Sequence, residues 1–176
     1  MPFAVTHVLI AIIVADIIRD YIVKDRRKFP LHYVLIAGIA GLLPDLDVPI
    51  WWILSNFGYS LSEVHRTFSH TLFVPLIFLL LAIFTVKTKS RFLARHKLKL
   101  NIIFYMITLG TMIHLLLDGF LVGFIMPLYP FSTAKFGLNL IPATDIGISL
   151  IAGLDAILLL AWLIHEEIRH KISDFI

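Results

Sequence analysis

The chain has 176 residues, of which 59% are hydrophobic and only 15% are charged, and its mean hydropathy is +0.92. A soluble domain of this length cannot bury so much apolar surface, so the composition indicates one integral membrane domain over residues 1–176. The absence of cysteine excludes disulfides and thiolate metal sites. The net charge of +3 comes from basic residues in short loops, so we expect no nucleic-acid partner.

Five apolar runs follow one another along the chain. Each is close to the ~20 residues that cross about 30 Å of hydrocarbon, although the second is short. The first lacks a basic leader and a small-residue cleavage site, so we expect it to be retained rather than removed as a signal peptide. We predict an all-α fold, a polytopic membrane helical bundle of about five transmembrane helices, with spans at Phe3 to Ile18, Phe29 to Leu43, Phe68 to Val86, Leu100 to Met126 and Ile146 to Ile164.

The basic residues predict the orientation in the membrane. Thirteen of the 15 Lys and Arg residues lie in the connections 19–29 and 87–99 or in the tail after residue 164, which leaves Arg66 and Lys135 elsewhere. With five spans, these three segments lie on one side, and the positive-inside rule makes that side cytoplasmic. We therefore expect the N-terminus outside and the C-terminus inside, in the plasma (inner) membrane.

Ionisable residues recur at one end of the apolar runs. A helical rise of about 1.5 Å per residue places them at one level, in the outer half of the bilayer, opening to the external or periplasmic face. Charged groups are costly in lipid and mark functional sites there, and His with Asp is a typical metal-ligand set. The residues are His7 in the first run, Asp45 and Asp47 after the second, His65 and His70 before the third, and His114 and Asp118 in the fourth.

Each of these residues also has a simpler interpretation. His114 and Asp118 are four apart and can form a hydrogen bond along one helix face. His7 can be an ordinary core histidine, and a Pro44-Asp45 pair is typical of a turn. Their matching depth favours a shared metal site over these separate explanations.

Arg66 lies beside the second cluster, and its guanidinium suits an anionic oxygen group such as phosphate. Contact with lipid headgroups explains Arg66 equally well. The segment from Pro127 to Pro142 is too apolar for an ordinary loop, so we expect it to lie on the membrane as a lid or entry wall.

Asp155 is the other ionisable residue within an apolar run. It can orient a ligand histidine or, when protonated, pair with Thr108 or Thr111. His165 and Glu166 fall beyond the predicted cytoplasmic end of the last span, where we expect surface residues.

The combined motifs resemble those of the YdjM family of membrane-bound, predicted metal-dependent hydrolases, which is distantly similar to zinc-dependent phospholipase C and P1 nuclease. The resemblance rests on His7, Leu-Leu-Pro-Asp-Leu-Asp at 42–47, His-Arg-Thr-Phe-Ser-His-Thr at 65–71 and His-Leu-Leu-Leu-Asp at 114–118. It covers most of the first 130 residues. It implies seven metal ligands, namely His7, Asp45, Asp47, His65, His70, His114 and Asp118.

A nitrogen and oxygen ligand set suits Zn²⁺, with Mn²⁺ or Fe²⁺ as alternatives, and seven ligands leave room for more than one ion. Such a site activates water for hydrolysis, with Asp45 or Asp47 as general base and Arg66 holding a phosphate oxygen. The expected partners are the lipid bilayer and an amphiphilic or phosphate-containing substrate. The alternatives are a divalent-cation transporter or sensor and a structural subunit with a stabilising metal; the oligomeric state is not indicated.

Overall fold

The computed structural model describes residues 3–25 and 28–170, and within these ranges the chain is helical, with one isolated bridge between Ile125 and Phe136 and no strand. The prediction of an all-helical protein is therefore confirmed. The longer helices are α1 (Ala4–Ile17), α2 (Leu31–Ala40), α5 (Phe73–Phe84), α7 (Leu100–Phe120) and α8 (Asp145–His170). The shorter ones are α3 (Asp47–Leu54), α4 (Leu61–Val64) and α6 (Arg91–Arg95), with 3-10 turns at Pro44–Leu46, Ser55–Phe57 and Phe68–His70 and a π-helix at Ile18–Val23 that extends α1.

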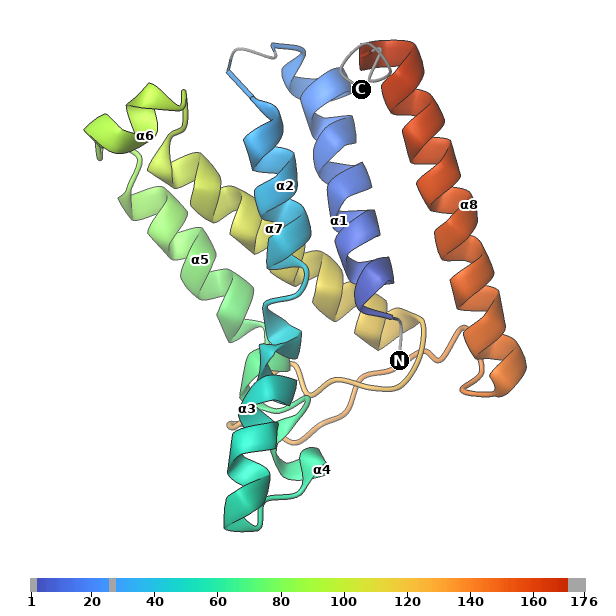
Figure 1. Ribbon diagram of the computed structural model, residues 1–176. Coiled ribbons are helices and arrows are strands. Elements are labelled where there is room, and N and C mark those ends of the chain that lie inside the picture. Colours follow the sequence, from blue (N-terminus) through green and yellow to red (C-terminus); the bar gives the residue numbers. More distant parts are fainter. Residues whose placement is uncertain (1–2, 26–27, 171–176) are drawn as a thin grey trace.

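The longer helices run alternately between two ends of the molecule (Figure 1). One end holds the start of α1, the short helices α3 and α4, and the connection between α7 and α8, while the other end holds α6 and the end of α8. Helix α7 packs against α5, α2 and α1, and α8 contacts α1 along the side of the bundle. The core at the α6 end is built from α1, α2 and α7, around Tyr33.

In the part of the chain that the structure describes, two helices are long and apolar enough to cross a membrane, Leu100–Phe120 and Asp145–Arg169. A third candidate span exists if Leu31–Ala40 and Pro44–Phe57, which meet at a bend of 48°, are counted together. Helices α1 and α5 are shorter, with 14 and 12 residues. Helix length and composition thus support two or three spans rather than clearly five. In α8 only 17% of the apolar window is buried inside the protein, so most of this helix faces outward.

Two of the predicted runs have different limits in the structure: one helix begins later and one ends earlier than predicted. The run that starts at Phe68 becomes helix α5 only at Phe73, because the preceding residues form a 3-10 turn that carries His70 into the interior. The run expected to reach Met126 leaves the helix at Phe120, and the chain then folds back along the end of α7. Both differences occur beside the ionisable residues, where side-chain contacts override the helical pattern.

Small residues allow α2 and α7 to approach closely. A Cβ atom on Gly110 would collide with the Ala37 carbonyl oxygen and would lie 2.7 Å from the Ala40 Cβ and 2.8 Å from the Gly41 nitrogen. On the other side of α2, a Cβ on Gly41 would lie 2.8 Å from the carbonyl oxygen of His7. Close backbone packing at small residues is the usual basis of helix association in membranes. This packing brings α1, α2 and α7 together at the level of the histidines.

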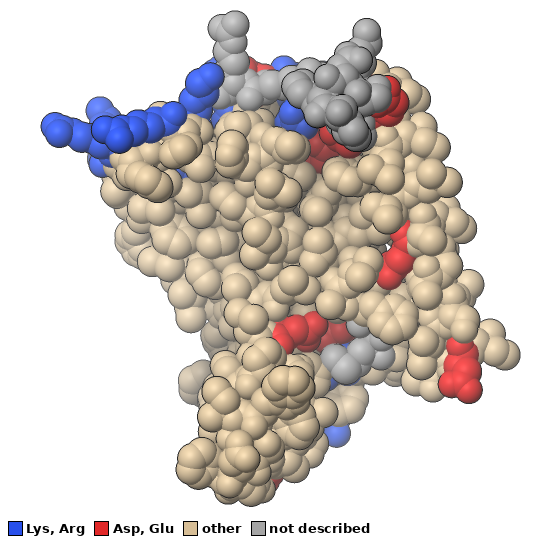
Figure 2. Space-filling view, in the orientation of Figure 1, with Lys and Arg blue, Asp and Glu red and all other residues tan. Residues whose placement is uncertain are grey.

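Lys and Arg gather at the end of the molecule that carries α6 (Figure 2). Tyr33 joins two elements there, since its hydroxyl accepts a hydrogen bond of 2.6 Å from the backbone nitrogen of Lys99. The basic segments expected on one side of the membrane therefore lie at one end of the fold. The start of α1, which carries His7, and the short helices α3 and α4 with the turns beside them lie towards the other end (Figure 1).

We expect Gly110→Ala to destabilise the protein, because the new methyl group meets backbone atoms of α2 that cannot move independently. Overpacking of this kind costs about 1–3 kcal/mol. The loss is measured as a lower midpoint of thermal unfolding in detergent. Gly153→Ala is the matched control: Gly153 lies in α8 and a Cβ there meets nothing within 4 Å. Ala is the better helix former, so this control should be neutral or stabilising, and equal effects of the two substitutions would contradict the proposed packing.

Candidate metal centre

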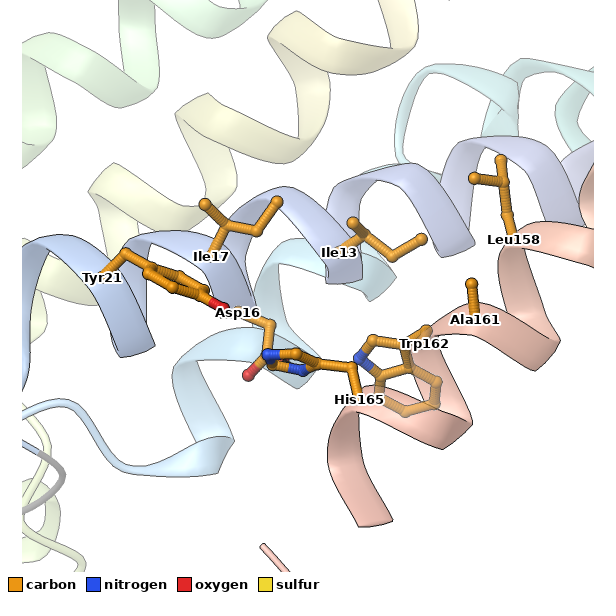
Figure 3. Close-up of a pocket in the computed structure, with 8 residues that line it drawn as sticks. All are labelled: Ile13, Asp16, Ile17, Tyr21, Leu158, Ala161, Trp162 and His165. Atoms are coloured by element: carbon orange, nitrogen blue, oxygen red, sulfur yellow. Dashed lines mark ion pairs between the residues drawn. The ribbon is translucent and has the colours of Figure 1, made fainter. Parts of the chain in front are cut away.

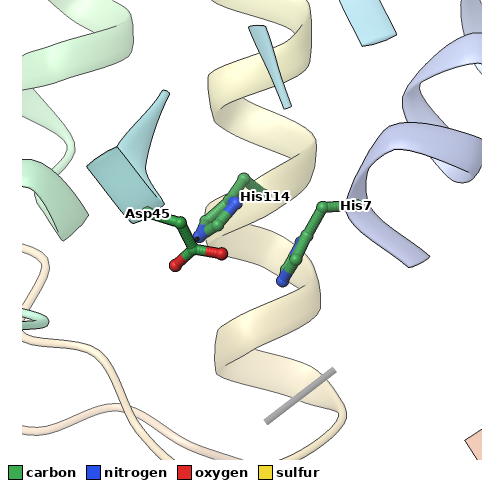
Figure 4. A group of neighbouring side chains, drawn as sticks. All are labelled: His7, Asp45 and His114. Atoms are coloured by element: carbon green, nitrogen blue, oxygen red, sulfur yellow. Dashed lines mark ion pairs between the residues drawn. The ribbon is translucent and has the colours of Figure 1, made fainter. Parts of the chain in front are cut away.

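Four segments that are far apart in the sequence bring six ionisable residues together. Helix α1 contributes His7, the turn after α2 contributes Asp45, and the segment before α5 contributes His65 and His70, while α7 contributes His114 and Asp118. The side chains of His7, His70, His114 and Asp118 have no exposed surface, whereas that of Asp45 is 23% exposed. Figure 4 shows three of these side chains pointing towards one another: His7 from α1, Asp45 from the turn that follows α2, and His114 from α7.

Hydrogen bonds at Nδ1 set the tautomers of three histidines. Nδ1 of His114 lies 2.7 Å from the carbonyl oxygen of Gly41, which can only accept, so this nitrogen carries the proton. Nδ1 of His65 donates to Asp47 Oδ1 over 2.8 Å. The Ser69 hydroxyl donates to Asp47 Oδ2, so it accepts from Nδ1 of His70 at 2.9 Å. All three rings therefore present the lone pair of Nε2 to the cluster, as metal-binding histidines do.

Four donor atoms lie in two triangles that share one edge. Nε2 of His70 lies 3.1 Å from Nε2 of His114, and these nitrogens lie 3.5 and 3.6 Å from Asp45 Oδ1. Asp118 Oδ2 lies 3.4 Å from the first nitrogen and 3.8 Å from the second. Tetrahedral coordination with Zn–N or Zn–O bonds of about 2.1 Å places neighbouring donor atoms about 3.4 Å apart. Each triangle therefore has the dimensions of one face of a tetrahedral metal site.

The cluster also contains buried polar atoms without a hydrogen-bond partner. Buried polar groups are nearly always paired in proteins, so a concentration of exceptions needs an explanation. The atoms without a hydrogen bond are both ring nitrogens of His7, Nε2 of His65, Oδ1 of Asp45 and both oxygens of Asp118, of which Oδ2 forms an ion pair with Arg66 at 3.2 Å. All of them are atoms that bind metals.

The charges of the cluster do not balance when its histidines are neutral. Asp45, Asp47 and Asp118 contribute three carboxylates, and Arg66, which pairs with Asp118, contributes one positive charge, which leaves two negative charges in a poorly solvated region. Both ring nitrogens of His70 lie close to carboxylate oxygens: Nε2 lies 3.5 Å from Asp45 and 3.4 Å from Asp118, and Nδ1 lies 3.2 Å from Asp47. The cluster therefore attracts positive charge, and a divalent cation would balance it.

Asp47 supports the cluster from outside. Both of its oxygens are occupied: Oδ1 by His65, and Oδ2 by the Ser69 hydroxyl at 2.6 Å, the Arg66 backbone nitrogen at 3.2 Å and His70 Nδ1 at 3.2 Å. Within the part of the chain that the structure describes, Asp47 belongs to none of the groups whose ligand atoms converge. Its position is that of a carboxylate that orients ligand histidines.

Arg66 links the cluster to the chain that follows α7. Its Nη2 lies 3.2 Å from Asp118 Oδ2, and Nη1 donates to the carbonyl oxygen of Phe124 over 3.1 Å. Gly123 has a φ of 96°, and any Cβ there would collide with Nη1 of Arg66. The guanidinium is therefore held in place by the protein, with its charge directed at a candidate ligand.

Asp155 has a different partner from the two threonines considered. It accepts a hydrogen bond of 2.8 Å from the hydroxyl of Thr6, next to His7. The hydroxyls of Thr108 and Thr111 donate to carbonyl oxygens of their own helix, so pairing of Asp155 with either is wrong. The simpler interpretation of His114 is wrong too, because its Nδ1 bonds to Gly41, and its Nε2 is 3.8 Å from Asp118, beyond hydrogen-bond distance.

A second ionisable cluster lies at the opposite end of α1. His165 Nδ1 on α8 lies 3.6 Å from Asp16 Oδ2 and 3.6 Å from Glu166 Oε1, and Asp16 also pairs with Arg19 at 3.2 Å. Figure 3 shows the side chains of Asp16 and His165 close together in a pocket between α1 and α8. Glu166 is only 5% exposed, so the expectation of a surface residue is wrong there. Glu166 lies only two positions beyond the end of the predicted apolar run, so its burial could not be recognised from the sequence.

The model of the YdjM inner membrane protein family matches residues 1–172. The chain belongs to the YdjM inner membrane protein family. No curated protein and no solved structure matched it significantly. For this YdjM protein, membership supports a location in the inner membrane, and every His and Asp residue of the candidate centre lies within the matched range.

Two contributors to the centre of the YdjM protein were missed by the sequence interpretation. The carbonyl oxygen of Gly41 orients His114, and the hydroxyl of Ser69 joins Asp47 to His70. A backbone carbonyl carries no sequence signal. Ser69 stands between the candidate ligands His65 and His70 in the motif, and this position was the only signal for its role.

Asp47→Asn should weaken the support of both histidines, because an amide has one acceptor oxygen where Asp47 accepts at both. Loss of hydrogen bonds to a buried carboxylate is expected to cost about 1.5–3 kcal/mol. The change is measured by denaturant unfolding in detergent. The control is Asp145→Asn at an exposed carboxylate in the first turn of α8, where about 0.3–1 kcal/mol is expected. Equal stability of the two variants would show that Asp47 does not hold the loop.

Proposed function

We propose that this protein is a membrane-embedded metal-dependent hydrolase of phosphate ester or phospholipid-type substrates. One observation carries the proposal: Nε2 of His70 and Nε2 of His114 lie 3.1 Å apart, and Asp45 Oδ1 and Asp118 Oδ2 each lie 3.4–3.8 Å from both nitrogens, which is the spacing of donor atoms around a tetrahedral ion. His7 is grouped with Asp45 and His114, and His65 with Asp45 and His70, so either histidine can supply a donor for a second ion.

The donor set favours Zn²⁺, since imidazole nitrogen and carboxylate oxygen ligands without sulfur are typical of zinc sites, with Mn²⁺ or Fe²⁺ as alternatives. A bound divalent ion lowers the pKa of a water ligand towards about 7 and stabilises charge on a phosphoryl oxygen. Asp47 is occupied by its four donors, so it positions His65 and His70. Asp45 is the partly exposed carboxylate of the cluster and is the better candidate for general base.

Arg66 contributes positive charge beside Asp118. Because two carbonyl oxygens and a carboxylate already hold its guanidinium, its main role is to keep Asp118 in place and to favour negative charge nearby. Contact with a phosphate oxygen remains compatible with this position, since Arg66 also lines the adjoining pocket.

For the membrane arrangement we propose five crossings, by α1, α2 with α3, α5, α7 and α8. The alternation of these helices between two ends and the basic residues at the α6 end support it. The N-terminus then lies outside, the C-terminus inside, and the cluster lies in the outer leaflet. An amphiphilic substrate can reach it from the side.

Cation transport is the second candidate, and one observation favours it. The α1–α8 interface carries polar groups from the candidate centre to the opposite end: Thr6 with Asp155, and Asp16 with His165. A transporter needs such groups along its path. Between these two pairs the pocket is lined by Ile13, Leu158 and Ala161, so the polar path is interrupted, and hydrolysis remains the better supported function.

His114→Ala should remove bound metal and activity together. Purified wild-type protein is expected to contain zinc by elemental analysis and to hydrolyse phosphate esters or phospholipids. Loss of a ligand should lower metal affinity by more than the 10- to 100-fold typical of supporting residues. The control is His96→Ala, an exposed histidine beyond α6. Folded wild-type protein that binds no added zinc would contradict the proposal, and metal uptake into liposomes without hydrolysis would favour transport.

The proposed orientation can be tested because the chain has no cysteine. Ser62→Cys and Lys89→Cys introduce single exposed thiols at the two ends of the fold. A membrane-impermeant maleimide added to spheroplasts should label Ser62→Cys only, and both after permeabilisation. Labelling of Lys89→Cys alone in intact spheroplasts would reverse the orientation.

A further inference from the structure

The two basic residues outside the three basic segments meet at one pocket. Arg66 and Lys135 are 69 positions apart, yet both line a pocket of about 580 Å³ beside the candidate metal centre. His65, whose unpaired Nε2 faces the centre, lines the same pocket. Apolar side chains form the remaining wall, chiefly Leu61, Phe124 and Met126. The pocket therefore combines positive charge, an apolar surface and direct contact with a candidate ligand.

The two cations have different environments. Arg66 is held by Asp118 and by two backbone carbonyl oxygens. The ammonium of Lys135 lies 4.2 Å from the centre of the Phe124 ring, and no carboxylate pairs with it among residues 3–25 and 28–170. A cation over an aromatic ring at such a site is stabilised by only about 0.5–1 kcal/mol, so an anion can engage it readily. Lys135 is thus available to a ligand, whereas Arg66 is engaged by the protein.

An apolar wall next to a free cation fits an amphiphile with a negatively charged headgroup. Phe124 and Leu61 are 38% and 41% exposed, and they lie on the pocket that Lys135 borders. In a membrane protein the nearest molecules of this chemistry are anionic lipids, and a lysine close to an anionic lipid surface contributes about 1 kcal/mol.

We propose that this pocket binds the headgroup of an anionic membrane lipid and that Lys135 is the residue that selects for its negative charge. That the bound lipid is a substrate rests on the proposed hydrolase function. Binding of the lipid in the pocket does not require that the protein hydrolyses it. Lipid bound there lies beside His65, with its headgroup next to the candidate ligands.

The test measures equilibrium binding of fluorescent short-chain phosphatidylglycerol and phosphatidylcholine to the full chain in neutral detergent. Lys135→Gln should weaken binding of phosphatidylglycerol about fivefold at low salt and leave phosphatidylcholine unchanged. Because exposed charges are screened by salt, the difference should shrink at 0.5 M salt. Lys87→Gln removes the same charge from an exposed site at the α6 end and should have no effect.

Lys135→Arg distinguishes loss of charge from loss of folding. It keeps the positive charge and should retain most of the affinity for phosphatidylglycerol. Equal binding of phosphatidylglycerol to wild-type protein and Lys135→Gln would overturn the proposal. So would glycerol phosphate binding as tightly as the lipid, because the pocket would then be a soluble phosphate site. Failure of the hydrolase proposal would give a different result. The protein would then lack bound zinc or hydrolytic activity but would still bind phosphatidylglycerol through Lys135.

Discussion

The close crossing of α2 and α7 is the contact on which the candidate centre depends. Gly110 removes the side chain that would separate the helices, and the carbonyl oxygen of Gly41 then reaches Nδ1 of His114. Lipid offers little hydrophobic driving force between helices, so such packing must supply the association. The same contact that joins the helices fixes the histidine tautomer. Fold and ligand geometry are thus set together, at one place.

The carboxylates around this contact are only partly paired with hydrogen-bond donors. Asp47 is surrounded by donors from the segment before α5, and it holds that segment against the turn after α2. Asp45 and Asp118 instead face the Nε2 atoms of two histidines and lack enough donors. In the cluster, the buried atoms without a hydrogen bond also include both ring nitrogens of His7 and Nε2 of His65. A protein under selection for stability alone would not concentrate unpaired carboxylate oxygens in its interior, which is why a cation is the simplest explanation.

The sequence allowed prediction of the helical class and of the residues that meet, because apolar length and loop charge are local properties. It did not allow prediction of their separate roles. Asp45 and Asp47 are two positions apart in one motif, yet they face different ring nitrogens. Asp45 faces Nε2 of His70 and His114, whereas Asp47 faces Nδ1 of His65 and His70. That difference arises from the 3-10 turn at Pro44–Leu46 and from partners 18 or more positions away, such as His65. Glu166 was misplaced for a similar reason, since its burial depends on α1 packing against α8.

Exposure at the centre indicates the side from which a substrate can approach. His7 stacks on His114 with ring centres 3.8 Å apart, and neither side chain has exposed surface, so the α1 side is closed. Asp45 is 23% exposed, and His65 borders the pocket that holds Lys135. Access therefore lies on the side of the loops that follow α2 and α7. There the apolar wall of the pocket can accept a lipid chain, while the buried histidines on the other side remain protected from water.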